Sequence, residues 1–300
     1  MMLRAVAESS RPHSYFIEQE RSEAGDAISI ATIILKNRRC PWRCVYCDLW
    51  KQASDFTVPI GAIPAQIDFA LNELREPCRQ IKLYNAGSFF DRAAIPPADF
   101  TVIAERVRSF ERVIVECHPA LIGESAVRFR DLLDAKLEVA MGLEIADDAI
   151  LKRINKRMTM AMFERASRFL RGNGIAVRAF VIVKPPFVRT EDEAIEFAVR
   201  SAEFAFDCGA TVVSLIPARF GTEELSALAV NGEFSPPQFS TVEAALDRVV
   251  ALQRGRVFVD LWNLEPFSTC SHCFAARRTR LEGINRHQQF TERIVCTCPG

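Results

Sequence analysis

The stretch AISIATIIL, residues 27–35, is nearly all apolar and rich in β-branched side chains. This composition is typical of a strand buried on both faces of a parallel sheet. Six or more β-α units at the observed spacing predict an α/β fold, either a complete or partial TIM-type barrel or a doubly wound sheet. The later runs that read as strands are QIKLY (80–84), RVIVEC (112–117), LEVAMGL (137–143), AVRAFVIV (176–183), ATVVSLI (210–216) and RVFVDLW (256–262).

The composition is that of an ordinary globular protein. The 300 residues are 49% hydrophobic and 25% charged, and 38 Lys and Arg balance 38 Asp and Glu. Zero net charge argues against a protein that coats nucleic acid by bulk charge, but it allows a local basic patch. Residues 1–14 lack the apolar core of a signal peptide, and no run approaches 18 apolar residues. We therefore predict a cytoplasmic protein without a membrane span.

Three of the ten cysteines lie in the loop that leaves the first predicted strand. They are Cys40, Cys44 and Cys47 in the segment CPWRCVYC. The carboxyl end of a parallel strand is where such folds place their chemistry, and clustered cysteines in a reducing compartment hold metal more often than they form disulfides. Three thiolates suit a 4Fe–4S cluster with one open iron better than they suit zinc. Buried thiols and a zinc site are the alternatives.

This cysteine spacing, with Tyr46 before the last cysteine, resembles the cluster loop of the radical S-adenosylmethionine (SAM) superfamily. The resemblance implies a partial (β/α)6 barrel, a 4Fe–4S cluster held by Cys40, Cys44 and Cys47, and SAM bound to the open iron. It also implies that an electron from the cluster cleaves SAM to a 5′-deoxyadenosyl radical. An external flavodoxin- or ferredoxin-like donor would supply this electron to the cluster. Tyr46 would lie near the adenine.

The turn after the second strand is the next candidate part of the SAM site. Asn85, Gly87 and Ser88 occupy the position where the superfamily carries a Gly-Gly-Glu-like turn that receives the SAM amino group. Gly87 permits the close backbone approach that a ligand needs, and the two polar side chains offer acceptor oxygens. The glutamate of that turn is missing here, so the atom that holds the amino group is left open.

Two charged residues close later strands. Glu144 ends the fourth strand and is a candidate ligand for the ribose of SAM, with a structural ion pair to Arg178 or Lys184 as the alternative. Lys184 ends the fifth strand and would either neutralise the SAM carboxylate or pair with Glu144. His118, after the third strand, is a candidate for substrate contact or proton transfer, or else a structural histidine.

Longer segments narrow the resemblance. The segments YNAGSFFD (84–91), EVAMGLEIADD (138–148), INKRMT (154–159), VIVKPPF (181–187) and SLIPAR (214–219) resemble the group that contains the elongator catalytic subunit, and most closely the radical-SAM subunits of archaeosine synthases. This likeness implies modification of a nucleobase in tRNA, of lyase or transferase type. The expected step is radical C–N cleavage of a lysine-adducted 7-deazaguanine to a formamidine, after a partner enzyme has prepared the substrate. The alternatives are a radical SAM enzyme acting on a small metabolite and a non-catalytic iron–sulfur or zinc sensor that binds nucleic acid.

Basic residues cluster near three of these features, which suits either a polyanionic partner or solvated surface positions. They are Lys36, Arg38, Arg39 and Arg43 around the cysteine loop, Lys152, Arg153, Lys156 and Arg157 after the fourth strand, and Arg277, Arg278, Arg280, Arg286 and Arg293 in the tail.

The end of the chain carries a second cysteine set. Cys270 and Cys273 form one short-spaced pair, and Cys296 and Cys298 form another. Four thiolates are compatible with a tetrahedral zinc site or with an auxiliary iron–sulfur cluster. The sequence thus predicts an N-terminal extension over 1–26, a barrel and a following strand over 27–265, and a small cysteine-rich metal-binding appendage over 266–300.

Overall fold

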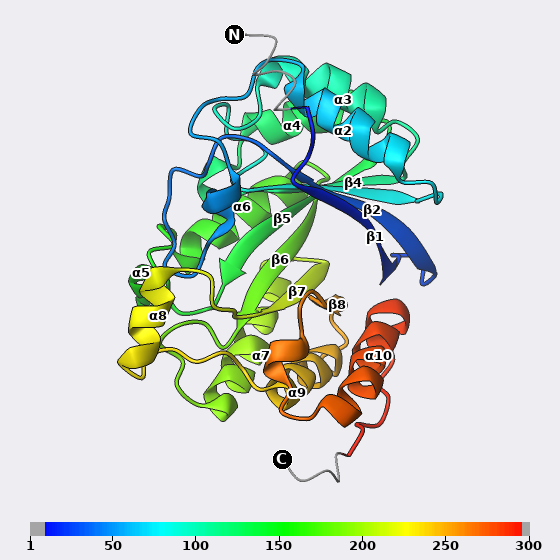
Figure 1. Ribbon diagram of the computed structural model, residues 1–300. Helices are drawn as coiled ribbons and strands as arrows, with labels where there is room; N and C mark the ends of the chain where they lie inside the picture. The colour runs from blue at the N-terminus through cyan, green and yellow to red at the C-terminus, as the bar shows by residue number, and fades with distance from the viewer. Residues whose placement is uncertain (1–9, 296–300) are drawn as a thin grey trace.

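One mixed sheet organises the chain. The computed structural model describes residues 10–295 and contains an eight-stranded sheet whose spatial order follows the sequence. β1 runs antiparallel to β2, and each later strand runs parallel to the one before it. The sheet curls into an incomplete barrel with helices on its outside (Figure 1). The strands are β1 (Ser14–Arg21), β2 (Ala27–Leu35), β3 (Gln80–Asn85), β4 (Arg112–Glu116), β5 (Lys136–Glu144), β6 (Ala176–Val183), β7 (Val212–Pro217) and β8 (Arg256–Val259).

The partial barrel predicted from the sequence is confirmed. β2 to β8 fall on the seven apolar runs, and their sequential order excludes a doubly wound sheet, in which the strand order reverses. Side chains that face the helices, such as Ile33, Leu83 and Val115, are completely buried. The strands read as continuous apolar runs because helices cover their outer face while other side chains fill the barrel.

Helices follow the parallel strands along the chain. Two short helices, α5 and α8, follow β5 and β7, and the long α10 is the last helix of the described residues. The α-helices are α2 (Ala62–Glu73), α3 (Phe100–Arg106), α4 (Glu124–Leu132), α5 (Asp148–Arg153), α6 (Met160–Gly172), α7 (Glu191–Asp207), α8 (Glu223–Val230), α9 (Phe239–Val250) and α10 (Ser271–His287).

Part of the predicted N-terminal extension belongs to the sheet. Residues 14–21 form β1, which pairs with β2 along its whole length. The segment SYFIEQER reads as polar because Glu18 and Glu20 interrupt its apolar pattern. Both carboxylates form ion pairs with Lys82 of β3, and the Glu18 pair measures 2.9 Å. The polar residues of this strand are therefore satisfied inside the barrel.

Helix α10 covers the free edge of β8. The Asn285 side chain accepts a hydrogen bond from Val259 N and donates one to Val259 O, both at 2.9 Å. Gln288 makes the same two contacts with Val257, at 2.6 and 2.7 Å. The two amides thus satisfy an edge that has no further strand to pair with. Residues 271–287 are consequently built onto the barrel, and the separate cysteine-rich appendage is not confirmed.

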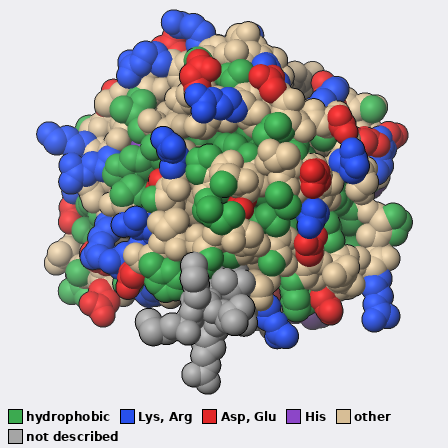
Figure 2. Space-filling model, turned by 90° about the horizontal axis from the view of Figure 1, so that it is seen from above, with side chains coloured by type: hydrophobic (Ala, Val, Ile, Leu, Met, Phe, Trp, Pro, Cys, Tyr) green, Lys and Arg blue, Asp and Glu red, His purple; other side chains and the backbone are tan. Residues whose placement is uncertain are grey.

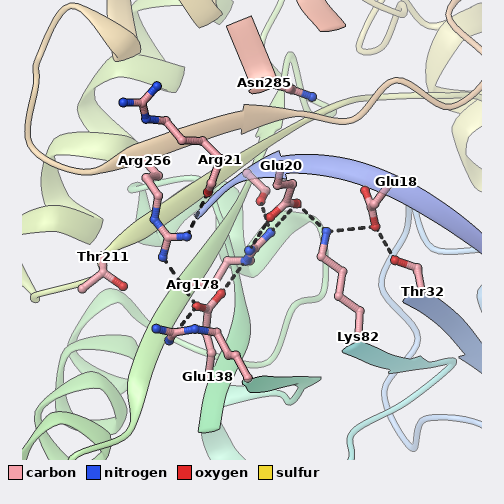
Figure 3. A network of polar contacts seen from close by, with 12 residues as sticks. Glu18, Glu20, Arg21, Thr32, Lys82, Glu138, Arg178, Thr211, Arg256 and Asn285 are labelled. Atoms are coloured by element: carbon pink, nitrogen blue, oxygen red, sulfur yellow. Dashed lines mark hydrogen bonds and ion pairs between the residues drawn. The ribbon is translucent and has the colours of Figure 1, made fainter. Parts of the chain in front are cut away.

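Ion pairs fill the barrel near the amino ends of the parallel strands (Figure 3). Arg178, only 1% exposed, donates to Glu138 at 2.7 Å and to both carboxylate oxygens of Glu20 at 2.8 and 2.9 Å. Lys82 also donates to Glu20, and Arg112 to Glu138 at 3.2 Å. Burial opposes ionisation of Glu20, but Arg178 and Lys82 hold its pKa well below the usual value. We call these five residues the barrel floor.

Candidate active site

The cysteine loop leaves β2 at the carboxyl edge of the barrel. Its first cysteine, Cys40, donates its backbone N–H to Ala86 O at 3.2 Å, in the turn after β3. The two arms of the loop pair with each other, because Ser54 N donates to Asn37 O at 2.8 Å and Arg39 N to Ser54 O at 2.9 Å. These bonds fix the base of the loop beside β3.

Two other rim loops hold the middle of the cysteine loop. Val45 N donates to Ile154 O at 3.0 Å, and the Thr222 hydroxyl donates to Val45 O at 2.6 Å. The Asn155 side chain donates to Arg43 O at 2.6 Å. Residues 154 and 155 follow β5, and residue 222 follows β7. The cysteine loop therefore crosses the mouth of the barrel.

All three thiols of the loop are partly buried. Burial raises the pKa of Cys40 and of Cys44, and it raises the pKa of Cys47 to about 12. Thiolates at these positions consequently need positive partners, which a thiolate-binding metal centre supplies. Within residues 10–295, no three Cys, His, Asp or Glu side chains converge closely enough to hold a single metal ion.

Buried amides without partners lie beside the turn after β3. Asn37 is fully buried and Asn85 is 1% exposed, and neither side chain has a hydrogen-bond partner among the described residues. A Cβ atom on Gly87 would lie 3.3 Å from Asn37 Nδ2 and 3.5 Å from Asn85 Nδ2, so the two amides flank this glycine. A buried polar group left unpaired costs about 1–3 kcal/mol. The predicted Asn85 and Gly87 are thus brought together with Asn37, which the sequence did not single out.

A glutamate that was missed in the sequence lies next to this turn. Glu116 ends β4, and its Oε1 accepts a hydrogen bond from Asn85 N at 2.8 Å. Burial raises the pKa of Glu116 to about 8, although the Asn85 N–H and the nearby Lys156 oppose the rise. The signal in the sequence was an acidic residue that closes an apolar strand, the same signal that pointed to Glu144.

Glu144 pairs with a lysine that the sequence assigned to a surface patch. Lys156 donates to Glu144 Oε1, and both residues are buried. Burial opposes the charge of Lys156, but Glu144 raises its pKa to about 12. Burial and the Glu144 carboxylate raise the pKa of Tyr46 well above its usual value. Tyr46 and Glu144 are therefore neighbours at the mouth.

The backbone at the end of β5 is shaped around this ion pair. The pairing of β5 with β6 shifts register between Gly142 and Glu144, and Glu144 has φ of 66°, in the left-handed region. A Cβ atom on Gly142 would lie 2.1 Å from Glu144 Oε1 and 2.5 Å from Lys156 Nζ. Only glycine leaves space for the pair at this position.

The two partners proposed for Glu144 from the sequence are wrong. Arg178 belongs to the barrel floor, and Lys184 donates to Glu191 of α7 and to Ser235 Oγ, the latter at 2.9 Å. Lys184 is buried, with φ of 58°, and its ammonium is engaged by these two groups. Lys156 is thus the cation beside Glu144 and the thiols.

His118 links the turn after β3 to the cysteine loop. Its backbone N–H donates to Ser88 Oγ at 2.9 Å, and its ring stacks on Trp42 with centroids 3.9 Å apart. Nδ1 accepts from Ala120 N at 3.1 Å, so Nε2 carries the proton and donates to Lys156 O at 2.9 Å. Burial and the Lys156 charge lower the pKa of His118 to about 4. The ring is accordingly a neutral structural contact.

Many of the predicted basic residues form ion pairs with acidic residues of the same chain. Lys156 is buried, Arg39 pairs with Asp55 at 3.0 Å, and Arg153 pairs with Glu233 at 2.6 Å. In the tail, Arg277 and Arg280 pair with acidic groups of α9. The exposed cations that remain near the mouth are Arg38, Arg43, Lys51, Lys152 and Arg157.

The structure describes only half of the second cysteine set. Cys270 is buried and precedes α10, where its Sγ accepts a hydrogen bond from Cys273 N at 3.4 Å. Cys296 and Cys298 lie outside the described residues. The four-cysteine metal site stays a prediction.

The match to a family model covers more than half of the chain. The model described as the radical SAM superfamily matches residues 34–198. This range includes the cysteine loop, the turn after β3, Glu116 and the Glu144–Lys156 pair.

Two curated proteins are similar in sequence. An uncharacterized protein of Methanocaldococcus jannaschii is 24% identical over 249 residues, which cover 78% of this chain and 68% of that protein. Archaeosine synthase subunit beta of Methanosarcina acetivorans is 27% identical over 218 residues, 69% of this chain. The match spans 62% of that subunit, less than two thirds of its length.

A solved structure shares the fold. Elp3 of Methanocaldococcus infernus, with residues 1–46 deleted, superposes with a TM-score of 0.51 at 17% identity over 66% of this chain and 50% of that chain. In the part of the chain that the structure describes, no helix has the length and apolar character needed to cross a membrane.

Proposed function

The chain belongs to the radical SAM superfamily, and we propose that it is the radical SAM component of an enzyme that modifies a nucleobase in tRNA. Enzymes of this superfamily use a 4Fe–4S cluster and SAM. The observation that carries the proposal is the cysteine loop across the barrel mouth, beside buried polar groups that have no partner within residues 10–295. The similarity to archaeosine synthase subunit beta supports tRNA as the substrate class.

The residues at the mouth fit these cofactors. We assign Cys40, Cys44 and Cys47 as the three protein ligands of the cluster, because soft thiolates are the usual ligands of iron–sulfur centres. When bound, the cluster supplies the electron that cleaves SAM to a 5′-deoxyadenosyl radical. The protein holds the loop through the backbone of Val45 and places the Lys156 ammonium near the thiolates, where it offsets their charge.

The groups around the turn after β3 suit the polar parts of SAM. We assign the Asn37 and Asn85 amides, and the backbone at Gly87, to its amino-acid moiety, since both amides lack partners. Ser88 positions this turn through His118. We assign Tyr46 and Glu144 to the adenosine moiety, with Lys156 holding the Glu144 carboxylate in place. Lys184 is engaged by Glu191 and Ser235, so we do not extend this assignment to it.

Glu116 supplies the carboxylate that the turn after β3 lacks. The α-ammonium of SAM is the only group of that molecule that donates charged hydrogen bonds, so a buried carboxylate at this turn is its natural acceptor. Glu116 Oε1 lies 2.8 Å from Asn85 N, at the start of the turn in which the superfamily's glutamate is missing. An ammonium bound there would favour the ionised form of Glu116 and lower its raised pKa.

A binding experiment separates this role from a structural one. In Glu116→Gln, the amide oxygen still accepts from Asn85 N, but SAM affinity at equilibrium dialysis should fall at least about tenfold, as for a lost charged hydrogen bond. The affinity for 5′-methylthioadenosine, which lacks the amino-acid moiety, should not change. Glu111→Gln, an exposed residue just before the same strand, is the control. Equal loss of both affinities would contradict the assignment.

We further propose the C–N lyase step of archaeosine formation as the reaction, with a partner enzyme that prepares the base and an external flavodoxin- or ferredoxin-like electron donor. The supporting observations are the relative's description as a subunit and the exposed cations near the mouth. Cys270 and Cys273, with Cys296 and Cys298, are assigned to a second metal, zinc or an auxiliary cluster.

Metal content and SAM cleavage test the whole proposal. Protein purified and reconstituted without oxygen should hold about four Fe and one Zn per chain, or about eight Fe if the tail holds a cluster. Reduction with dithionite should yield 5′-deoxyadenosine from SAM. Cys44→Ala should abolish this product and remove about four Fe, whereas Cys78→Ala, away from the mouth, should do neither. A loaded cluster that never yields the product would favour the sensor alternative.

A further inference from the structure

Three exposed aromatic side chains lie on the carboxyl side of the barrel. They are Trp50, Phe220 and Trp262, which are 39%, 53% and 71% exposed. Trp50 lies in the short helix Leu49–Gln52 after the cysteine loop, Phe220 follows β7, and Trp262 follows β8. Exposed apolar side chains that gather on one face mark a binding site more often than scattered ones do. We call these three residues the aromatic band.

The band is continuous because its loops contact one another. Lys51, next to Trp50, donates to Gly221 O, next to Phe220. Arg219 donates to the Trp262 carbonyl, and its guanidinium carbon lies 5.5 Å from the Trp262 ring centroid. The loops that carry Trp50, Phe220 and Trp262 therefore lie against one another.

Cations alternate with the aromatic rings. The Arg43 guanidinium carbon lies 5.9 Å from the Trp50 ring centroid, Lys51 follows Trp50, and Arg219 precedes Phe220. Within residues 10–295, Arg43 and Lys51 are exposed and form no ion pair, whereas Arg219 pairs with Asp260 at 2.9 Å. Figure 2 shows Lys and Arg side chains among hydrophobic ones along its left edge, the side toward which the parallel strands point in Figure 1.

We propose that the aromatic band binds unpaired RNA nucleotides next to the base that is modified. Bases would stack on Trp50 and Trp262, and Arg43 and Lys51 would contact the phosphates. This inference rests on the proposed function, in which the substrate is an RNA. Interleaved aromatics and cations are the arrangement that holds single strands, whereas a protein partner with an apolar face would leave the unpaired cations unsatisfied.

The position of the band relative to the candidate site supports this occupant. Trp50 comes three residues after Cys47, and Asp48 lies against Gly221, since a Cβ on that glycine would be 2.8 Å from Asp48 Oδ2. A base stacked on Trp50 is thus held next to the cysteine loop. Chemistry on a base requires that it leave its stack, so its unpaired neighbours need a surface of this kind.

The test uses the reconstituted enzyme and two fluorescent RNA probes of equal length, one single-stranded and one duplex. The double variant Trp50→Ala/Trp262→Ala should bind the single strand at least about 30-fold more weakly, because two stacking contacts are lost. Trp50→Phe/Trp262→Phe should recover most of the affinity. Arg43→Ala/Lys51→Ala should weaken binding and reduce the slope of log K against log salt by about 1.4. Phe16→Ala, an exposed aromatic on β1, should match the wild type.

The readouts distinguish the band from the proposed function. Formation of 5′-deoxyadenosine without RNA reports the radical chemistry and should be unchanged in the Trp50 and Trp262 variants. If the wild type binds single-stranded RNA and the alanine double variant binds it equally well, only the band inference fails. If the wild type cleaves SAM but binds neither probe, the RNA substrate and the band fail together. Loss of a partner subunit with RNA affinity retained would identify a protein interface instead and overturn the inference.

Discussion

The floor and the mouth of the barrel both bury polar groups, but they differ in whether these groups have hydrogen-bond partners. At the floor, Arg178 is satisfied by Glu20 and Glu138 through three hydrogen bonds of 2.7–2.9 Å. At the mouth, the Asn37 and Asn85 side chains have no partner among the described residues. Buried polar groups are nearly always paired, so the ion pairs of the floor are structural, and the two unpaired amides beside Gly87 support our proposal that a ligand binds at the mouth.

Substitutions at the floor and at the mouth should therefore differ in their effects on stability and on ligand binding. A change at the floor leaves a buried charge without its counter-charge, which destabilises the fold. Removing an amide at the mouth that has no partner among the described residues, Asn37 or Asn85, takes no hydrogen bond from the fold, so its effect should appear in ligand binding. Stability and SAM affinity measured on the same variants therefore test the comparison directly.

Arg178→Met should have the largest effect on stability. It leaves Glu20 and Glu138 facing each other inside the barrel, and we expect the free energy of unfolding to fall by about 3–5 kcal/mol. The measurement is urea denaturation of oxygen-free protein of matched iron content. Arg168→Met breaks an exposed pair with Glu164 on α6 and should cost less than about 0.5 kcal/mol. Similar costs for the two variants would show that the floor network is not structural.

Gly142→Ala should be the next most damaging change. The added methyl group would overlap Glu144 Oε1, so the Glu144–Lys156 pair must move or break, at a cost of about 2–3 kcal/mol. SAM affinity should fall as well, because Glu144 is displaced. Gly172→Ala, at the end of α6, adds a methyl group with no atom within 4 Å and should be neutral or slightly stabilising. A Gly142→Ala protein that is as stable as Gly172→Ala would disprove the packing around this pair.

His118 should make stability at the mouth depend on pH. Its pKa is lowered to about 4 in the folded protein from 6.5, so the unfolded chain takes up the proton first and acid favours unfolding. Between about pH 7.5 and 5 the wild type should lose about 2 kcal/mol more than His118→Gln, in which glutamine cannot titrate. Above pH 7.5 the two profiles should run parallel. Equal losses on acidification would mean that the His118 ring is solvated.

The parts of the fold predicted from the sequence are those that depend on local pattern. The strands from β2 to β8 are recognisable in the sequence as apolar runs, and the cysteine loop is recognisable by the spacing of its cysteines. β1 was not predicted as a strand because Glu18 and Glu20 break its apolar pattern. The cation that pairs with them, Lys82, lies more than 60 residues away in the sequence. α10 escaped because the Asn285 and Gln288 amides serve β8, which is not visible in the helix's own sequence.

In the candidate site, too, the sequence predicted positions at strand ends but not the contacts between them. Tyr46, Asn85, Gly87, Ser88 and Glu144 come to the mouth, because the ends of parallel strands meet at one edge. The pairings could not be read from the sequence, since Lys156 reads as one of four basic residues after β5. Glu116 was missed for a related reason, because its contact with Asn85 joins residues 31 positions apart.

The sharpest test of the mouth compares Asn85 with a buried amide on α10 that is fully hydrogen-bonded to the edge of β8. Asn285 is a buried amide with both hydrogen bonds made, so Asn285→Leu leaves the N–H and C=O of Val259 unpaired and should cost about 2–3 kcal/mol. Asn85 is a buried amide with neither bond made, so Asn85→Leu removes unsatisfied atoms and should raise stability by about 1 kcal/mol. SAM affinity should fall at least about tenfold in Asn85→Leu, by the loss of hydrogen bonds to the ligand, and stay unchanged in Asn285→Leu. Denaturation and equilibrium dialysis measure the two quantities on each protein. If Asn85→Leu instead lost stability and kept its SAM affinity, the amide would belong to the fold, and the assignment of the mouth to a ligand would fail at this residue.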